Sequence, residues 1–313
     1  MKVSVLIKAY NHERFIADAV ESVLEQRVGC DYEIVIGEDC STDGTRAVLL
    51  SLRDKYPDHV RLLLRDRNLG NIRNFTDALR ACRGEYVALL DGDDYWISPL
   101  KLRHQIAFLD AHREFSSCAH HAVVVDESAR SFLGTYHRQG RSHVITLRRM
   151  LMSDPVPTSS VMFRRGLFAE FPDWYYTVMM GDWPLHVLNL AHGNMWYESA
   201  VLAAHRVHPS GLWSGADPVR RRTARIEIYW RLNEELGLAH DALIRARIAR
   251  QYVALAEHYA ENGDIIRARE CVRHAVRAYR WAPRLLLRRS FLKLLPDVFR
   301  QSRRISGSAG LLL

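Results

Sequence analysis

The segment YVALLDGDDYW, residues 86–96, places three carboxylates directly after an apolar run. Residues 86–90 have the composition of a strand covered on both faces, as in a parallel sheet with helices on its two sides. Asp91, Asp93 and Asp94 then follow at the carboxyl end of that strand, the edge where open α/β sheets bind ligands. Carboxylates this close repel one another, and a divalent cation is the usual remedy. The alternative interpretation is an aspartate-rich turn that caps a helix.

A second strand end is also acidic. The strand predicted over residues 32–39 ends in Glu38 and Asp39, which a parallel sheet brings to the same edge as Asp91 and Asp93. A carboxylate there can accept a base N–H or a ribose hydroxyl, while a metal at Asp93 screens a diphosphate. The chain contains neither G-x-G-x-x-G nor G-x-x-x-x-G-K-[ST], which argues against a dinucleotide enzyme and a P-loop NTPase. The two acidic ends together predict a site for a nucleoside diphosphate.

Strands and helices alternate over the first hundred residues and would position these acids. The apolar periodicity predicts strands over 2–10, 32–39, 60–66 and 85–94, and helices over 13–26, 41–57, 68–82 (after a loop) and 98–112. This order predicts an α/β fold with a doubly wound, mostly parallel sheet and helices on both sides.

The pattern changes after Phe115. Strands are expected in 116–126, 159–165 and from 195 onward, with helices in 145–153 and 181–193. We expect this region to extend the sheet and to shape the pocket of a second substrate. From Pro218 the chain reads as helical and rich in arginine, which divides it into a domain of residues 1–215 and a helical C-terminal region of residues 216–313. Five residues match the spacing of a single tetratricopeptide helix pair: Ala256, Tyr259, Gly263, Ala268 and Ala275. One such pair predicts an appendage packed on the main domain, not a repeat array.

Charge is unevenly distributed along the chain. The net charge is +8, yet residues 216–313 hold 20 basic and 10 acidic side chains, against 24 basic and 26 acidic in the first 215. The basic region indicates an anionic partner, for which a membrane surface and a nucleic acid both qualify. Within it, residues 280–304 mix Leu, Trp and Phe with arginines, typical of an interfacial helix or of a packed helix with a basic outer face.

The remaining composition is that of an ordinary soluble globular protein, with 48% hydrophobic residues. The five cysteines are scattered and form no C-x-x-C pair, so we expect neither a disulfide framework nor a structural zinc site, and a reducing compartment. The first residues lack the apolar length and cleavage site of a signal peptide, and no apolar run reaches the roughly 20 residues of a membrane span.

Five segments in order resemble the successive motifs of family 2 glycosyltransferases of the bacterial polysaccharide type: VSVLIKAYNHERFIADAVESVLEQ, EIVIGEDCSTDGT, NLGNIRNF, GEYVALLDGDDYW and HRVHPSG. The resemblance covers residues 1–215 and implies a GT-A fold. It also implies an inverting transfer of a sugar from a nucleoside-diphosphate-sugar, with a UDP-sugar favoured, to an acceptor hydroxyl. The acceptor would be a glycan, a lipid-linked or another hydroxyl compound, in cell-surface polysaccharide or glycoconjugate biosynthesis. Two positions depart from the family pattern: Glu38 stands where Asp is frequent, and Lys8 where small or hydroxyl residues are frequent.

The resemblance assigns a role to each matching residue. Asp91 and Asp93 form the D-x-D motif, in which Asp93 binds Mn²⁺ or Mg²⁺ and Asp91 lies near the ribose or the metal. His208 completes the metal or diphosphate site, unless it is a loop histidine without a partner. The residues expected to bind the nucleotide are Ala9, Tyr10, Asn11, Glu38, Asp39, Asn68, Gly70, Asn74, Asp91, Gly92 and Arg206.

Asp182 is the candidate catalytic base. An inverting transfer needs a base opposite the leaving group, and a carboxylate at the start of a helix is held in a defined position, although capping alone would also explain it. Nearby aromatic residues either stack on sugar rings or belong to the core: Trp174, Tyr175, Tyr176 and Trp183. Thr158 and Ser159 are expected on the acceptor side, and Asp94 facing the donor sugar or supporting its loop. His120 and His121, neighbours on a strand, point to opposite faces and are expected to be structural.

Two rival functions remain. A sugar-nucleotide nucleotidyltransferase requires a glycine-rich, basic phosphate loop after the first strand, and KAYNHERF is not such a loop. A non-catalytic scaffold that binds protein or nucleic acid through the helical tail would not need the acids at 91, 93 and 182. We expect a cytoplasmic enzyme, either cytosolic or peripheral on the cytoplasmic face of the inner membrane through its tail, with no nucleic-acid partner.

Overall fold

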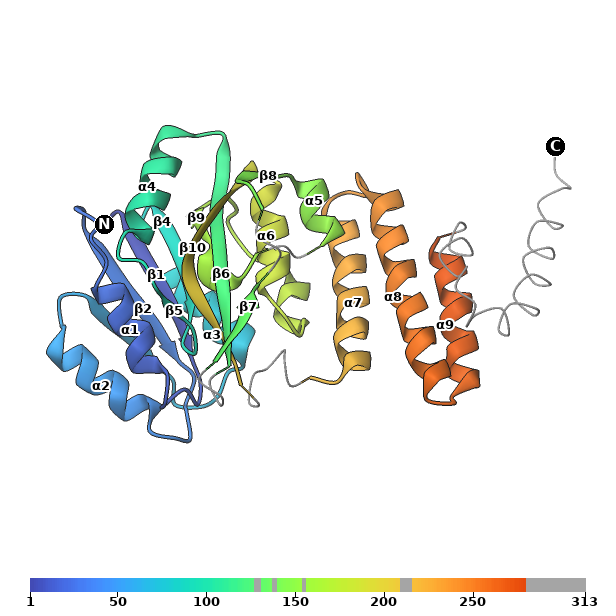
Figure 1. Ribbon diagram of the computed structural model, residues 1–313, viewed down its shortest axis with the longest axis horizontal. Coiled ribbons are helices and arrows are strands. Elements are labelled where there is room, and N and C mark those ends of the chain that lie inside the picture. The colour runs from blue at the N-terminus through green and yellow to red at the C-terminus, as the bar shows by residue number, and fades with distance from the viewer. Residues whose placement is uncertain (127–130, 137–139, 154–155, 209–215, 280–313) are drawn as a thin grey trace, which may run out of the picture. The chain divides into compact units, whose positions relative to one another are not determined.

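The computed structural model describes residues 1–126, 131–136, 140–153, 156–208 and 216–279 (Figure 1). The chain divides into two compact units, Met1–Gly215 and Ala216–Leu313. The first unit contains the sheet, and the second consists of helices over its described residues.

The first unit begins with the predicted alternation of strands and helices. Four strands pair in parallel in the order β3-β2-β1-β4: β1 (Val3–Ala9), β2 (Tyr32–Glu38), β3 (Val60–Leu64) and β4 (Tyr86–Asp91). They are joined by α1 (Ile16–Leu24), α2 (Thr45–Lys55) and α3 (Asn71–Ala81). These elements confirm the predicted α/β order, and each is shorter than predicted because its polar flanking residues form the connecting loops.

The second half of this unit widens the sheet. Beyond β4 the order continues β9-β6-β10-β5, with β9 (Met162–Arg164) antiparallel to both β4 and β6 (Phe115–Asp126), and β10 (Asn194–Val207) parallel to β6. Three short strands escaped prediction: β5 (Tyr95–Trp96), β7 (Ser131–Thr135) and β8 (His143–Ile145). The helical elements of this half are α4 (Lys101–Ala111), α5 (Leu147–Met152), α6 (Asp182–Leu190) and the 3₁₀ segments Thr158–Ser160 and Asp173–Thr177. The sheet is therefore parallel through β4 and mixed beyond it.

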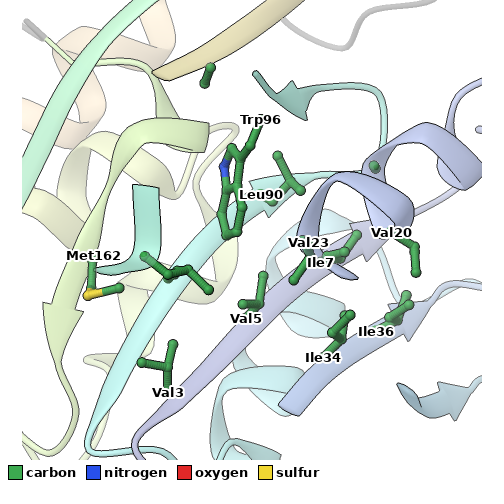
Figure 2. Packing of buried hydrophobic residues seen from close by; sticks show 14 of the residues in the cluster. Val3, Val5, Ile7, Val20, Val23, Ile34, Ile36, Leu90, Trp96 and Met162 are labelled. Atoms are coloured by element: carbon green, nitrogen blue, oxygen red, sulfur yellow. The ribbon is translucent and has the colours of Figure 1, made fainter. Parts of the chain in front are cut away.

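The main core lies on one face of the parallel strands. Val3, Val5 and Ile7 of β1 share this face because successive strand residues alternate, and they pack among the apolar side chains of α1 (Figure 2). The alternate residues Leu6 and Lys8 lie on the opposite face. There, α3 approaches so closely that a Cβ on Gly37 would lie 2.6 Å from Oδ1 of Asn74. Side chains on β1 thus reach either the α1 face or the α3 face of the sheet.

The second unit contains α7 (Pro218–Glu235), α8 (Asp241–Glu261) and α9 (Ile265–Ala278). The predicted helix pair corresponds to α8 and α9, which turn at Gly263 with φ +80°. Ala256, Ala268 and Ala275 are fully buried within the pair. None of the described helices is long and apolar enough to cross a membrane. The predicted interfacial segment 280–304 lies outside the described residues.

Candidate active site

The acidic turn at the end of β4 folds over the end of β1. Lys8 of β1 is in register with Asp91, and the Gly92 amide donates to the carbonyl oxygen of Lys8 at 3.0 Å. A Cβ on Gly92 would lie 2.7 Å from that carbonyl oxygen and 2.6 Å from Nδ1 of His12. Glycine is required here because the turn has no room for a side chain.

A basic group of the chain accompanies each carboxylate of this turn. The ammonium of Lys8 lies 2.8 Å from Oδ1 of Asp91. Nε2 of His208 lies 3.0 Å from Oδ2 of Asp93. The buried Asp94 accepts the backbone amide of Arg206 at 2.9 Å and contacts Nδ1 of His205 at 3.1 Å. The repulsion that the sequence implied is therefore offset by side chains from β1 and β10.

These contacts shift the proton affinities of the groups. Burial raises the pKa of Asp91 and the charges of Asp93 and Asp94 add to this, against the opposing charge of Lys8. Burial would also raise the pKa of Asp93, but the hydrogen bond of His208 and the charge of His12 hold it below its ordinary value. Burial disfavours charged His205, yet the charge and hydrogen bond of Asp94 raise its pKa to about 9. These shifts favour an ionised carboxylate at Asp93 and a protonated imidazole at His205.

Arg206 and His208 hold the turn from the β10 side. The buried guanidinium of Arg206 donates to the carbonyl oxygen of Asp93 at 3.0 Å and to Oδ2 of Asp18 at 2.5 Å. It also lies 4.3 Å from the ring centre of Tyr95. Arg206 therefore ties α1, the acidic turn and β10 together. The alternative interpretation of His208 as a loop histidine without a partner is wrong, because Asp93 is its partner.

The donor atoms of this turn are of the kinds that a hard divalent cation takes. Asp91 and Asp93 present carboxylate oxygens, the ligands that Mg²⁺ and Mn²⁺ prefer, and His208 adds an imidazole nitrogen beside Asp93. Within the described parts of the chain, no group of three or more His, Cys, Asp or Glu side chains is arranged to hold an ion. The metal assignment to Asp91, Asp93 and His208 therefore stays a prediction.

Glu38 and Asp39 fix the loops next to the turn. Glu38 is fully buried and accepts the Ser41 amide and Nε of Arg46, each at 2.6 Å. Asp39 accepts the amides of Leu69 and Gly70 at 2.7 and 2.9 Å. Both carboxylates are thus bound within the chain, which favours a role in shaping the site; their contact with a nucleotide stays a prediction.

The other expected nucleotide-binding residues differ in exposure. Tyr10 is 42% exposed, and Asn11, with φ +57°, accepts the Thr42 amide at 2.9 Å. Asn68 donates to the carbonyl oxygen of Asp39 at 3.1 Å. Buried Asn74 donates to the carbonyl oxygen of Gly37 at 2.7 Å and so joins α3 to β2. Ala9 is buried as well, and its carbonyl oxygen accepts the Asp39 amide. Of the five, Tyr10, Asn11 and Asn68 are exposed.

Asp182 is the first residue of α6 and is partly exposed. Its Oδ2 accepts the hydroxyl of Thr158 at 3.1 Å, and its Oδ1 accepts the Trp183 amide at 2.9 Å. The helix cap is Gly181, although the Trp183 contact gives Asp182 part of a capping role. The negative charge of Asp182 also helps raise the pKa of Lys8, after the larger effects of burial, which lowers it, and of Asp91. Lys8 therefore pairs with Asp91 and also feels the charge of Asp182.

The nearby aromatic residues divide between core and surface. Tyr175 and Trp183 are buried, and they donate to the carbonyl oxygens of Gly181 and Met150. Trp174 and Tyr176 are half-buried. Ser159 is buried, which leaves Thr158 as the partly exposed member of the predicted acceptor-side pair. His120 and His121 are buried in β6, consistent with structural roles.

Four residues at this site were not singled out from the sequence. His12 lies 3.8 Å from Asp93, His205 contacts Asp94, Asp18 binds Arg206, and Arg46 binds Glu38. His205 stands within HRVHPSG, so its place in that motif was the available signal. Asp18 and Arg46 look like ordinary exposed residues of helices, and the sequence contains no sign of their distant partners.

The model of the family described as glycosyl transferase family 2 matches residues 4–170, more than half of the chain. Protein Rv1520 of Mycobacterium tuberculosis is 34% identical over 70% of this chain. The chain spans 63% of the length of that relative. The Escherichia coli protein WfaP, named UDP-Glc:alpha-D-GlcNAc-diphosphoundecaprenol beta-1,3-glucosyltransferase, is 34% identical over 40% of this chain and 47% of its own.

Two solved structures have a similar fold. S. aureus TarS 1-349 in complex with UDP-GlcNAc matches with a TM-score of 0.66 at 18% identity, over 96% of this chain and 92% of that one. The mannosyltransferase PcManGT from Pyrobaculum calidifontis, in complex with GDP-Man and Mn²⁺, matches with a TM-score of 0.58 at 16% identity, over 95% and 79% of the two chains.

Proposed function

The chain belongs to glycosyl transferase family 2 and has the GT-A fold of such enzymes, and we propose that it transfers one sugar, with inversion, from a nucleoside-diphosphate-sugar to an acceptor hydroxyl. The observation that carries this proposal is the grouping of acids around Lys8. Asp91 and Asp93 lie at the end of β4, and the charge of Asp182, at the start of α6, acts on the same ammonium. The site for the diphosphate, at Asp91 and Asp93, would thus lie next to Asp182, the base for the acceptor hydroxyl.

Asp91 and Asp93, with His208, would hold the divalent cation. When bound there, the ion would neutralise charge on the leaving diphosphate. His205 and Arg206 keep the turn in place through Asp94 and the Asp93 carbonyl oxygen, so that the ligand oxygens stay oriented. Tyr10, Asn11 and Asn68 provide exposed groups for the base and ribose on the neighbouring loops.

Asp182 would accept the proton of the acceptor hydroxyl as that oxygen attacks the sugar carbon. The hydroxyl of Thr158 and the Trp183 amide orient its carboxylate. The ionised form of this carboxylate is the one that a base requires.

The names of similar proteins support a class of donor, a class of acceptor and a metal ion for this chain. A bound UDP-GlcNAc in TarS and the UDP-Glc in the name of WfaP favour a UDP-sugar donor for this chain. The diphosphoundecaprenol-linked acceptor in that same name favours a lipid-linked acceptor, and bound Mn²⁺ in PcManGT favours a divalent ion. Together they favour a role in bacterial polysaccharide biosynthesis, which we place at the cytoplasmic face of the membrane as part of this proposal.

A thermal-shift screen of UDP, GDP, ADP, CDP and dTDP, each with Mn²⁺ or with EDTA, tests the proposal. Binding to the folded state raises the melting temperature, so one diphosphate should stabilise the chain, and more strongly with Mn²⁺. Its sugar conjugates should then release that diphosphate in the presence of acceptor. Stabilisation by none of the five would contradict the proposal and favour a non-catalytic role for the chain.

A further inference from the structure

Lys8 is the residue of the site whose role the proposed reaction leaves unassigned. We propose that its ammonium binds the β-phosphate of the donor, so that the first strand itself provides part of the countercharge for the diphosphate. This inference rests on the proposed function, because it describes the donor site of the same reaction.

The position of Lys8 follows from the strand that carries it. It is the penultimate residue of β1 and points to the sheet face opposite the main core, the face that α3 approaches. Its Nζ lies 2.8 Å from Asp91, and the charges of Asp182 and Asp93 also act on it. Because Lys8 pairs with Asp91, two residues from Asp93, a diphosphate held at Asp93 would lie within reach of this ammonium.

The other cationic groups around the turn are engaged in holding it together. Arg206 is buried and bonded to Asp18 and to the Asp93 carbonyl oxygen. His205 and His208 contact Asp94 and Asp93. Lys8, in contrast, has Asp91 as its one hydrogen-bonding partner over the described residues, and 23% of its side chain is exposed. An ammonium has three N–H groups, so two remain for a ligand.

The pairing with Asp91 prepares Lys8 for this role. Because the carboxylate already fixes the long side chain, little rotamer freedom is lost when a phosphate oxygen becomes a further acceptor. A charge-assisted bond from an ammonium to a phosphate oxygen is one of the stronger hydrogen bonds in proteins. The simpler alternative, in which Lys8 only neutralises Asp91, predicts no contribution to nucleotide binding.

Calorimetry with UDP and UMP, on the full chain in EDTA and in Mn²⁺, separates these alternatives. If the thermal screen identifies another diphosphate as the strongest ligand, that diphosphate and the corresponding monophosphate replace UDP and UMP. Lys8→Gln should weaken UDP binding by at least about tenfold and leave UMP affinity nearly unchanged, because only UDP carries the β-phosphate. Lys8→Arg keeps the charge and should retain most of the UDP affinity. Lys2→Gln is the matched control, since Lys2 lies at the other end of β1 and pairs with Glu85 and Asp110.

The outcomes are distinct. Equal weakening of UDP and UMP, or no weakening of either, would overturn the role of Lys8 while leaving the proposed function intact. No binding of any diphosphate by the unsubstituted chain would contradict the proposed function itself. Should Lys8→Gln unfold because Asp91 loses its partner, the double variant Lys8→Gln with Asp91→Asn removes both charges, and the UDP to UMP comparison is repeated against Asp91→Asn alone.

Discussion

Nε2 of His208 lies 3.0 Å from Oδ2 of Asp93, although 115 residues separate the two along the chain. The contact joins the end of β10 to the turn after β4, and it places an imidazole beside the carboxylate expected to bind the metal. It also explains why HRVHPSG, far from DGDD in the sequence, belongs to the same site.

The first prediction concerns Asp93. Asp93→Asn removes a charged oxygen ligand but keeps the size of the side chain, so the fold should persist while Mn²⁺-dependent binding of the nucleoside diphosphate is lost. Calorimetry with Mn²⁺, with and without UDP, measures the effect. Asp58→Asn, an exposed aspartate before β3, is the control and should behave as the unsubstituted chain does. Unchanged Mn²⁺ affinity in Asp93→Asn would count against the metal assignment.

The second prediction concerns Asp182. Asp182→Asn should lower kcat by at least about a hundredfold, because an amide cannot accept the proton, while the Kd for the donor changes little. Asp173→Asn serves as a control, since Asp173 also begins a helical segment but is exposed. A loss of donor affinity as large as the loss of turnover would indicate that Asp182 is a structural residue at the start of α6.

The third prediction uses Gly92 to test the packing of the acidic turn. Gly92→Ala places a Cβ 2.7 Å from the Lys8 carbonyl oxygen, and we expect it to cost roughly 1–3 kcal/mol of unfolding free energy. Gly44→Ala is the control, because its new Cβ would meet the flexible end of the Glu13 side chain, which can move away. Urea denaturation of both variants compares them, and equal midpoints would refute the close approach at Gly92.

The placement of the acids could be predicted from the sequence because buried strands are visible as apolar runs. Asp91 and Glu38 follow such runs directly, so the carboxyl edge of a parallel sheet located both. The strands β5, β7 and β8 escaped prediction because each is short and no longer apolar run surrounds it, unlike the equally short β3 and β9.

The partners of the acids could not be predicted, since they come from distant positions. Arg206 contacts Asp18 across 188 residues and Asp94 across 112, and no local pattern encodes either contact. Asn74 was expected beside the nucleotide, yet it lies buried against Gly37; a polar residue in a helix can face inward when the opposing strand has a glycine.

The fourth prediction concerns the basic tail, residues 280–304. If it docks on an anionic bilayer, the full chain should sediment with anionic vesicles and not with neutral ones, and high salt should release it. Replacing Arg288, Arg289 and Arg300 with Gln should weaken attachment by about a hundredfold, at about 1 kcal/mol per arginine. The same replacement at Arg220, Arg221 and Arg222 of α7 removes equal charge and should matter less. Recovery in the supernatant under every condition would favour soluble acceptors.

The fifth prediction concerns Lys101, the first residue of α4. Its side chain is fully buried, and its Nζ has no hydrogen-bond partner in the described part of the chain, lying 3.7 Å from the ring centre of Trp96. A ring face stabilises a cation by about 2 kcal/mol, less than the cost of burying an unpaired ammonium. Burial accordingly lowers the pKa of Lys101 well below its ordinary value, and we expect the amine to be neutral in the folded state.

Neutral Lys101 makes stability depend on pH in a defined direction. Between its lowered pKa in the folded state and 10.5, the unfolded chain binds a proton at this residue that the folded chain does not, so the contribution of Lys101 to stability rises with pH, by up to about 1.4 kcal/mol per unit. Lys101→Met keeps the volume and removes the titrating group. The variant should therefore be more stable than the unsubstituted chain at pH 7.5, and its advantage should shrink toward pH 9.5 in urea denaturation. Exposed Lys55, replaced by Met, should give a difference that is constant over this range. A constant difference for Lys101→Met as well would mean that the amine stays protonated in the core, held by a contact that the ring of Trp96 alone does not supply.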